Sequence, residues 1–165
     1  MDDLLTERLI LHPLTIAEAQ RVAAGEAGPD DSWAADYPAE GERVGARMFV
    51  KGHAAVGGDT HPFGGYEIRH RTGGQAIGGI GFHGAPDEDG AVAIGYGLAE
   101  SARGQGYATE AVRGILAAAG GWGVRRILGD TTHDNVPSQR VMLAAGLAFT
   151  HEDEELKYYA AELAQ

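Results

Sequence analysis

The sequence predicts a mixed α/β fold in which a mixed sheet of about six or seven strands carries helices on both faces. Three apolar segments separated by turn residues, at 65–68, 76–82 and 91–98, favour an antiparallel meander. The last of these leads through a glycine-containing loop into an amphipathic helix and another strand, a pattern typical of a parallel crossover. With 165 residues, 44% of them hydrophobic, the chain suffices for one domain with its own core and is short for two.

The N-terminal part is predicted to hold one strand and one helix. Residues 9–11, just before Pro13, are a short apolar run that indicates a strand. Thr15 and Glu18 have the spacing of a capping box, in which the side chain of each residue accepts a hydrogen bond from the backbone N–H of the other. We therefore expect a helix that begins at Thr15 and ends near Gly25.

Residues 28–62 have little periodicity, and within them only residues 42–55 indicate a helix. We expect this segment to be a variable, partly mobile cover on the substrate side of the molecule. It contains the aromatic residues Trp33 and Tyr37. Aromatic side chains in such a segment either line a substrate pocket or anchor the segment to the core, and the sequence supports both interpretations.

The most regular helix is predicted over residues 106–119, before two consecutive glycines. Its apolar residues recur at spacings of three and four, which places on one face Ala108, Ala111, Val112, Ile115, Leu116 and Ala119. A strand over residues 126–131 follows and completes the crossover.

The C-terminal part is predicted to contain one more helix and two strands. Asn135 caps a short helix that has Pro137 in its first turn and Gly146 just past its end. Residues 147–150 and 157–161 give the last two strands, with an acidic loop between them. An edge strand in this region is compatible with a homodimer.

Composition excludes several classes of function. The chain has no cysteine, so disulfides, thiolate metal sites and cysteine nucleophiles are excluded, and no metal is expected. The sequence shows no secretion signal, and no apolar run approaches the length of roughly 20 residues that spans a bilayer. We therefore expect a cytoplasmic protein without membrane contact. A net charge of −11 disfavours the binding of nucleic acid and favours a cationic partner such as an amine. The alternative interpretation is that this charge only keeps the protein soluble.

Residues 103–108 form a candidate phosphate site between a strand and a helix. Free backbone N–H groups and the positive end of the helix dipole both attract an anion at the start of a helix. Gly104 and Gly106 let the backbone approach phosphate oxygens because they have no Cβ. The sequence therefore predicts a phosphate-bearing cofactor.

The same residues resemble the acetyl-CoA pyrophosphate motif of the GNAT acyltransferase superfamily. That motif is a basic residue or glutamine followed by x, x, Gly, x and Gly or Ala. Further matches are Thr6-Glu7-Arg8-Leu9, Ile94-Gly95-Tyr96, Ala108-Thr109-Glu110-Ala111 and Asn135-x-x-Ser138. Together they are similar to the subgroup that contains the ribosomal-protein N-terminal acetyltransferases. The resemblance is weak only over residues 28–62, and it implies one acetyltransferase domain over residues 1–165 with a strongly bent sheet.

This resemblance implies a set of cofactor-binding residues. The pyrophosphate of acetyl-CoA would bind the loop amides of Arg103, Gly104, Gln105, Gly106, Tyr107 and Ala108. Leu98 and Ala99 match positions whose backbone groups pair with the pantetheine arm in a gap between splayed strands, where an N–H also stabilises the oxyanion. An ordinary buried strand end is the alternative for these two residues. Asn135 either contacts the cofactor or only caps its helix.

Direct acetyl transfer to an amine, through a tetrahedral intermediate, needs a base for the amine and an acid for the departing thiolate. Glu67 resembles the position of a carboxylate used by some relatives and is the candidate base. A solvated, outward-facing glutamate is the alternative, and His83 is the reserve base. Many superfamily members use a tyrosine as the acid at the position of Met142, which has no proton to donate. Ser138 is then the candidate acid, with a hydrogen bond to the helix start as its alternative role.

The hypothesis from sequence is therefore an N-acetyltransferase that uses acetyl-CoA and an amine acceptor, either a small molecule or a protein N-terminus. One rival is a CoA-binding sensor or scaffold without catalysis, which Met142 favours. Another is a nucleotide-dependent oxidoreductase in which Asp130 holds a ribose. Two observations disfavour the oxidoreductase. The dinucleotide-binding motif has a third glycine where this chain has Thr109, and here the glycine loop follows an antiparallel meander.

Overall fold

The computed structural model describes residues 1–164 and contains one eight-stranded sheet in the order β1-β2-β3-β4-β5-β6-β8-β7. The strands are β1 (Leu4–Leu5), β2 (Leu9–Pro13), β3 (Gly65–His70), β4 (Ala76–Phe82), β5 (Ala91–Leu98), β6 (Arg126–Thr132), β7 (Ala148–Glu152) and β8 (Leu156–Glu162). The helices are α1 (Ile16–Ala24), α2 (Glu40–Val56), α3 (Tyr107–Ala119) and α4 (Val136–Ala145), with short 3₁₀ turns η1 (Glu100–Ala102) and η2 (Gly120–Trp122). The mixed α/β prediction is confirmed. The extra strand is β1, which is too short to give a periodic signal.

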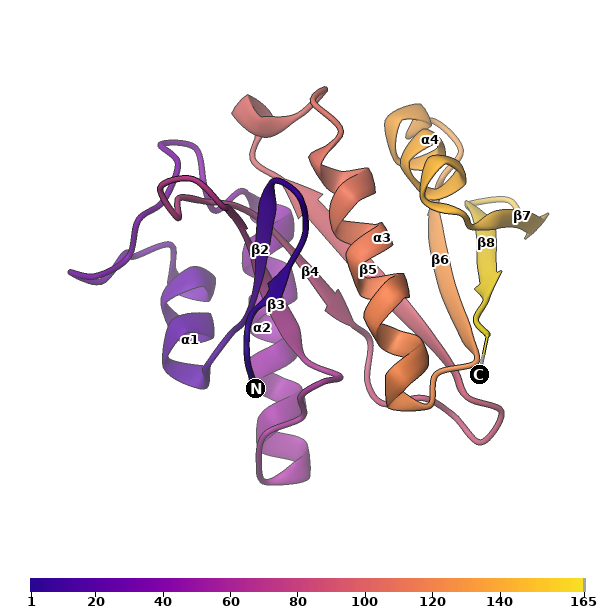
Figure 1. Ribbon diagram of the computed structural model, residues 1–165, viewed down its shortest axis with the longest axis horizontal. Helices are drawn as coiled ribbons and strands as arrows, with labels where there is room; N and C mark the ends of the chain where they lie inside the picture. Colours follow the sequence, from indigo (N-terminus) through magenta and orange to yellow (C-terminus); the bar gives the residue numbers. More distant parts are fainter. Residues whose placement is uncertain (165) are drawn as a thin grey trace.

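Helices cover both faces of the sheet, as predicted (Figure 1). Helix α2 packs on β3, β4 and β5 with α1 beside it, and α3 lies on the opposite face with α4 against it. Neighbouring strands are antiparallel except for β5 and β6, which are parallel. The predicted meander and crossover are therefore both present.

The parallel pairing of β5 with β6 is short. It runs from Ala91 opposite Arg126 to Ala93 opposite Leu128, although β5 continues to Leu98. Beyond that register the two strands diverge toward their carboxyl ends (Figure 1). The backbone pairing of the sheet is therefore interrupted beside the end of β5, on the side where the chain turns into α3, and we call this interruption the opening.

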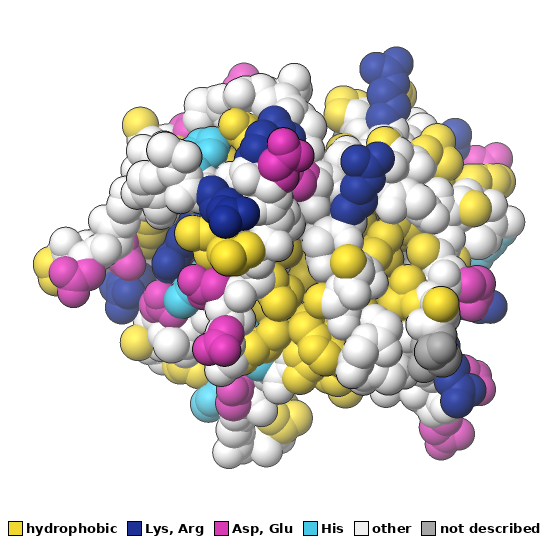
Figure 2. All heavy atoms as spheres, viewed as in Figure 1, with side chains coloured by type: hydrophobic (Ala, Val, Ile, Leu, Met, Phe, Trp, Pro, Cys, Tyr) yellow, Lys and Arg dark blue, Asp and Glu magenta, His cyan; other side chains and the backbone are white. Residues whose placement is uncertain are grey.

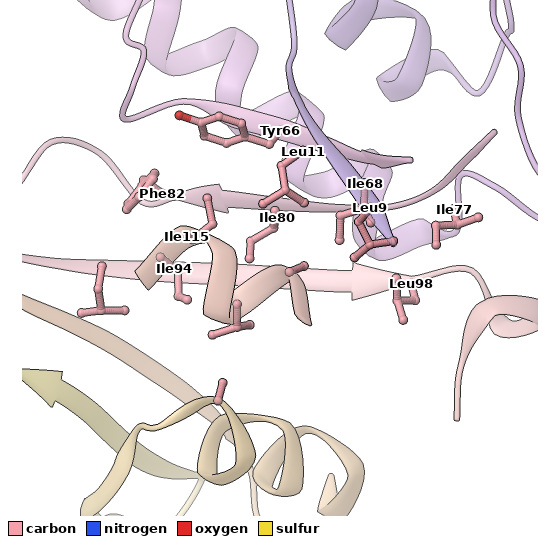
Figure 3. Packing of buried hydrophobic residues seen from close by; sticks show 14 of the residues in the cluster. Leu9, Leu11, Tyr66, Ile68, Ile77, Ile80, Phe82, Ile94, Leu98 and Ile115 are labelled. Atoms are coloured by element: carbon pink, nitrogen blue, oxygen red, sulfur yellow. The ribbon is translucent and has the colours of Figure 1, made fainter. Parts of the chain in front are cut away.

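The core that holds this arrangement lies between α3 and the sheet. Ile115 of α3 lies among Leu11, Ile80 and Ile94 from β2, β4 and β5, and all four side chains are buried (Figure 3). Because burying an aliphatic side chain contributes about 1.5–3 kcal/mol, this cluster fixes α3 against the meander. The position of the helix start relative to β5 follows from this packing.

The N-terminal capping box is present as predicted. The Thr15 hydroxyl accepts from the Glu18 N–H at 3.1 Å, and the Glu18 carboxylate accepts from the Thr15 N–H at 2.9 Å. Gly25 ends the helix with φ at +71°. The helix expected over residues 42–55 is α2, which is slightly longer, so part of the predicted cover is regular structure.

We expect Thr15→Ala to lower the free energy of unfolding by about 1 kcal/mol, because the Glu18 N–H at the start of α1 loses its acceptor. Urea denaturation followed by circular dichroism measures the change. Thr15→Ser keeps the hydroxyl and should stay near the wild-type value. Equal midpoints for all three proteins would show that the box adds no stability.

Candidate active site

The loop before α3 presents free backbone donors. Gly104 and Gly106 have φ of +77° and +81°, and Gly106 is the N-cap of α3. Within residues 1–164, the amides of residues 104–109 donate to no other group, whereas the Arg103 amide donates to the Glu100 carbonyl at 3.1 Å. The predicted anion site therefore begins at Gly104, and the expectation for the Arg103 amide is corrected.

The Arg8 side chain, just before β2, holds this loop in place. The Arg8 guanidinium donates to the Gln105 carbonyl at 2.9 Å, pairs with Glu110 at 2.7 Å and lies 4.5 Å from the centre of the Tyr107 ring. Arg8 and Arg113 border a surface hollow of about 420 Å³ next to Gly106. Glu7 and Glu110 border the same hollow, and Figure 2 shows basic and acidic side chains together near the upper end of α3. Sequence reasoning noted the motif that contains Arg8 but gave the residue no role.

At the end of β5, the backbone N–H and C=O groups point alternately toward β4 and toward β6. The Ala99 N–H donates to the Ile77 carbonyl of β4 at 2.8 Å, and the Ala99 carbonyl accepts from the Ala102 N–H at 2.9 Å. Since backbone groups alternate in direction along a strand, those of Tyr96 and Leu98 point toward β6. The Leu98 N–H thus points toward the opening, and the Leu98 carbonyl accepts from the Arg103 side chain at 3.1 Å. Ala99 does not face the opening, because both of its backbone groups are already bonded within the chain.

Ser138 lies in the first turn of α4 and contacts β5. Its N–H donates to the Asn135 side-chain oxygen at 3.2 Å, so Asn135 is the helix cap. The Ser138 hydroxyl lies 2.9 Å from the Tyr96 hydroxyl, and burial raises the pKa of that phenol. A hydroxyl pair therefore connects α4 to the strand that borders the opening.

Met142 is a core residue and takes no part in this pair. Its side chain is 1% exposed, and its sulfur lies where a side chain on Gly129 of β6 would have to stand. The helix face that carries the tyrosine in many superfamily members is used here for packing.

Glu67 is buried, so the interpretation of a solvated, outward-facing glutamate is wrong. One carboxylate oxygen accepts from the Tyr37 hydroxyl at 2.8 Å, and the other pairs with the Arg69 guanidinium at 2.8 Å. Tyr37 thus ties the segment 28–62 to β3. Trp33 forms an isolated bridge with Ala76, which makes it an anchor.

A cavity of about 460 Å³ lies between α2 and the strands β3, β4 and β5. Its walls are mainly apolar and include Val44, Met48, Phe49, Phe63, Tyr66 and Phe82. Its floor is made by glycines of β4 and β5. Tyr37 and His83 also border it, whereas Glu67 is not one of the lining residues found within residues 1–164.

Glu42 is the carboxylate that lines this cavity, and sequence reasoning missed it. It stands in the first turn of α2 and is 8% exposed, and its Oε1 atom has no hydrogen-bond partner within residues 1–164. Burial raises the pKa of its carboxyl. The backbone N–H groups of Glu42 and Ala39 and the Arg103 charge oppose this rise, and Asp36 reinforces it. A signal did exist, because Glu42, Ala46 and Phe49 share one helix face at spacings of four and three.

Neither a membrane span nor a metal cluster is found among residues 1–164. No helix there is long and apolar enough to cross a bilayer. No group of three or more histidine, aspartate or glutamate residues there has the arrangement of a metal site.

Free amides at a helix start, beside an opening between parallel strands, form a candidate binding site for a phosphate-bearing ligand. The sequence matches the acetyltransferase (GNAT) domain family over residues 8–148, and the chain belongs to that family. A relative from Bacillus subtilis (strain 168), uncharacterized N-acetyltransferase YjdG, is 33% identical over 90 residues. Those residues are 52% of this chain and 51% of YjdG, so the match spans about half the length of that relative.

Solved structures show the same fold. RimL, a ribosomal L7/L12 alpha-N-protein acetyltransferase in complex with coenzyme A, is similar with a TM-score of 0.70, 17% identity and 98% coverage of both chains. A ribosomal-protein-S5-alanine acetyltransferase from Vibrio fischeri is similar with a TM-score of 0.69, 15% identity and coverage of 98% of this chain and 97% of its own. The resemblance to this superfamily is confirmed, and its ribosomal-protein subgroup is among the structural neighbours.

We expect Glu42→Gln to stabilise the protein at pH 8, on the order of 1 kcal/mol, because it removes an unpaired buried charge. The folded state holds the Glu42 proton more tightly than the unfolded state does. The destabilising charge is therefore absent below the unfolded pKa and fully present above the folded one. Urea denaturation at pH 5 and pH 8 should show a gap between variant and wild type that widens with pH. A pH-independent gap would contradict this assignment.

Proposed function

We propose that this protein transfers the acetyl group of acetyl-CoA to a primary amine. Membership of the GNAT family supports acetyl-CoA as the donor. The observation that carries the proposal is the run of free amides at residues 104–108, placed beside the opening between β5 and β6. There the diphosphate would bind the helix start, and the pantetheine arm would reach the backbone of Leu98.

The chain supplies groups for each later step. In our proposal the amine attacks the thioester carbonyl directly, and the Leu98 N–H, which faces the opening, stabilises the tetrahedral oxyanion. Ser138 gives the departing thiolate its proton, with the Tyr96 hydroxyl 2.9 Å away to replace it. The Asn135 side chain fixes Ser138 through the helix cap.

Glu67 as the base stays a prediction, and its contacts suggest a second role. With Tyr37 and Arg69 on its two oxygens, it positions the wall of the cavity.

Glu67→Gln should keep acetyl-CoA binding and slow turnover. Thermal melting with acetyl-CoA and steady-state kinetics separate the two effects, and wild-type turnover would remove Glu67 from the reaction.

A CoA-binding sensor or scaffold is the second candidate, because Met142 replaces the tyrosine acid of many relatives. Thiol release from acetyl-CoA with a panel of amines distinguishes it, since a pure binder releases none. Because the chain has no cysteine, a thiol reagent reacts only with the liberated CoA and not with the protein. Stabilisation by NAD in place of acetyl-CoA would instead support an oxidoreductase.

We expect Gly106→Glu to abolish acetyl-CoA binding. A side chain at φ +81° strains the loop, and a carboxylate there repels the diphosphate. Isothermal titration calorimetry measures the affinity. Gly73→Glu is a matched control, because Gly73 also has positive φ, at +87°, with open space around it in the turn before β4. Normal binding by Gly106→Glu would overturn the proposed cofactor site.

We expect Ser138→Ala to lower kcat by about 100-fold, the lower end of the range for loss of a general acid, with little change in the KM for acetyl-CoA. Ser138→Thr retains a hydroxyl and should recover part of the activity. Steady-state thiol release measures both variants. If Ser138→Ala turns over at the wild-type rate, the serine only starts its helix.

A further inference from the structure

Two polar atoms in the cavity wall are buried without a hydrogen-bond partner in residues 1–164. They are the Glu42 Oε1 atom and the Thr60 hydroxyl. A buried polar atom without a partner costs about 1–3 kcal/mol, and more when it is charged. The cavity is therefore incomplete by itself, and a ligand with hydrogen-bond donors would complete it.

The carboxylate of Glu42 stands directly over two glycines of the sheet. A Cβ on Gly97 would lie 3.3 Å from its Oε2 atom, and one on Gly79 would lie 3.7 Å from its Cγ. Gly97 immediately precedes Leu98, whose backbone N–H points toward the opening between β5 and β6. A group bound to Glu42 is thus held next to the place where the thioester is expected.

Helix capping accounts for only part of this placement. Glu42 is the third residue of α2, and the backbone N–H groups of Ala39 and Glu42 oppose the rise in its pKa, but its Oε1 atom has no hydrogen-bond partner within residues 1–164. A carboxylate in the first turn of a helix is stabilised by the helix dipole, but Glu40 in the same turn obtains this while exposed and paired with Arg47. Glu42 forms no ion pair within residues 1–164, although Arg103 is close enough to lower its pKa. Neither capping nor an ion pair explains why its Oε1 atom is buried against the cavity.

We propose that Glu42 binds the ammonium group of the acceptor and receives its proton, and that the acceptor is a primary amine on a compact apolar body. This inference rests on the proposed acetyl transfer. The ammonium gives one proton to Glu42, and the neutral nitrogen attacks the thioester carbon to form the C–N bond. Collapse of the intermediate breaks the C–S bond. The thiolate takes a proton through Ser138, the second amine proton restores that hydroxyl, and Glu42 releases its own proton to water.

The acceptor class follows from the walls of the cavity. A volume of about 460 Å³ suits a small ligand, and the aromatic and aliphatic walls favour an apolar body. One carboxylate neutralises one ammonium group. A polyamine would bury further cations against Phe63 and Phe82 without partners, which is costly. The Thr60 hydroxyl offers one additional hydrogen bond.

The test uses the full chain, acetyl-CoA and three acceptors: phenethylamine, spermidine and a short peptide with a free alanine N-terminus. Thiol release is measured for wild type, Glu42→Gln and the matched control Glu40→Gln, which removes the same charge from the same turn in solvent. We expect phenethylamine to be the preferred acceptor. Glu42→Gln should lose about 100-fold in kcat/KM, while Glu40→Gln stays at the wild-type level.

The pH profile is a second readout. The wild-type rate should rise with pH as the Glu42 carboxyl loses its proton, at a pKa above its ordinary value. The pH profile of Glu42→Gln should lack this rising limb. The groups that act on Glu42 are Arg103 of the cofactor loop, Asp36 and Tyr37, and these remain in the variant. Glu42→Asp restores a carboxylate and should recover part of the rate. Phenethylamine should also raise the melting temperature of the wild type and not that of Glu42→Gln.

The outcomes separate this inference from the proposed function. If acetyl-CoA neither stabilises the protein nor releases thiol with any amine, the proposed function fails. If acetyl-CoA binds but spermidine or the peptide is preferred, the acceptor class is wrong. Wild-type turnover and an unchanged pH limb in Glu42→Gln would overturn the role of Glu42.

Discussion

The early end of the parallel pairing between β5 and β6 is the constraint on which the rest of the site depends. A continuous parallel ladder would satisfy the backbone of Tyr96 and Leu98 and would close the sheet. Because pairing stops at Ala93, the Tyr96 backbone and the Leu98 N–H point into the opening, while the Leu98 carbonyl accepts from the Arg103 side chain. The packing of Ile115 in the core then places the start of α3 at the carboxyl end of the same strand, so the anion site and the opening face one ligand.

The cover and the cofactor loop are joined by hydrogen bonds and are not independent parts. The Asp36 carboxylate accepts from both the N–H and the hydroxyl of Ser101, at 2.8 and 2.7 Å, just before the phosphate loop. The Arg103 side chain in turn donates to the Leu98 carbonyl at 3.1 Å. Ordering the loop around a diphosphate therefore also orders the segment that leads into α2 and Glu42. The acceptor cavity and the cofactor site share these contacts.

Local chemistry explains which features the sequence could predict. The capping box at Thr15, the helix face containing Ile115, and the glycine loop before α3 depend on neighbours within a few residues, and all are present. The corrections at Ala99 and Arg103 have a different origin. Their amides are taken by Ile77 and Glu100, partners that only the fold or a 3₁₀ turn brings near. Glu42 was missed although it shares a helix face with Ala46 and Phe49, because the cavity that buries this face is formed by distant strands.

Glu42 also bears on the meaning of the acidic composition. With a net charge of −11, the whole surface attracts cations weakly and without selectivity, because exposed carboxylates are hydrated and screened by salt. A carboxylate that is 8% exposed, in an apolar cavity, has lost its water already and gains most from an ammonium partner that has an apolar body. In the proposed reaction, long-range attraction brings amines to the molecule, and the unpaired oxygen of Glu42 beneath α2 selects which of them is held at the thioester. The proposed selectivity thus depends on one buried charge, and an ammonium ligand would offset the free energy that this charge costs the folded state.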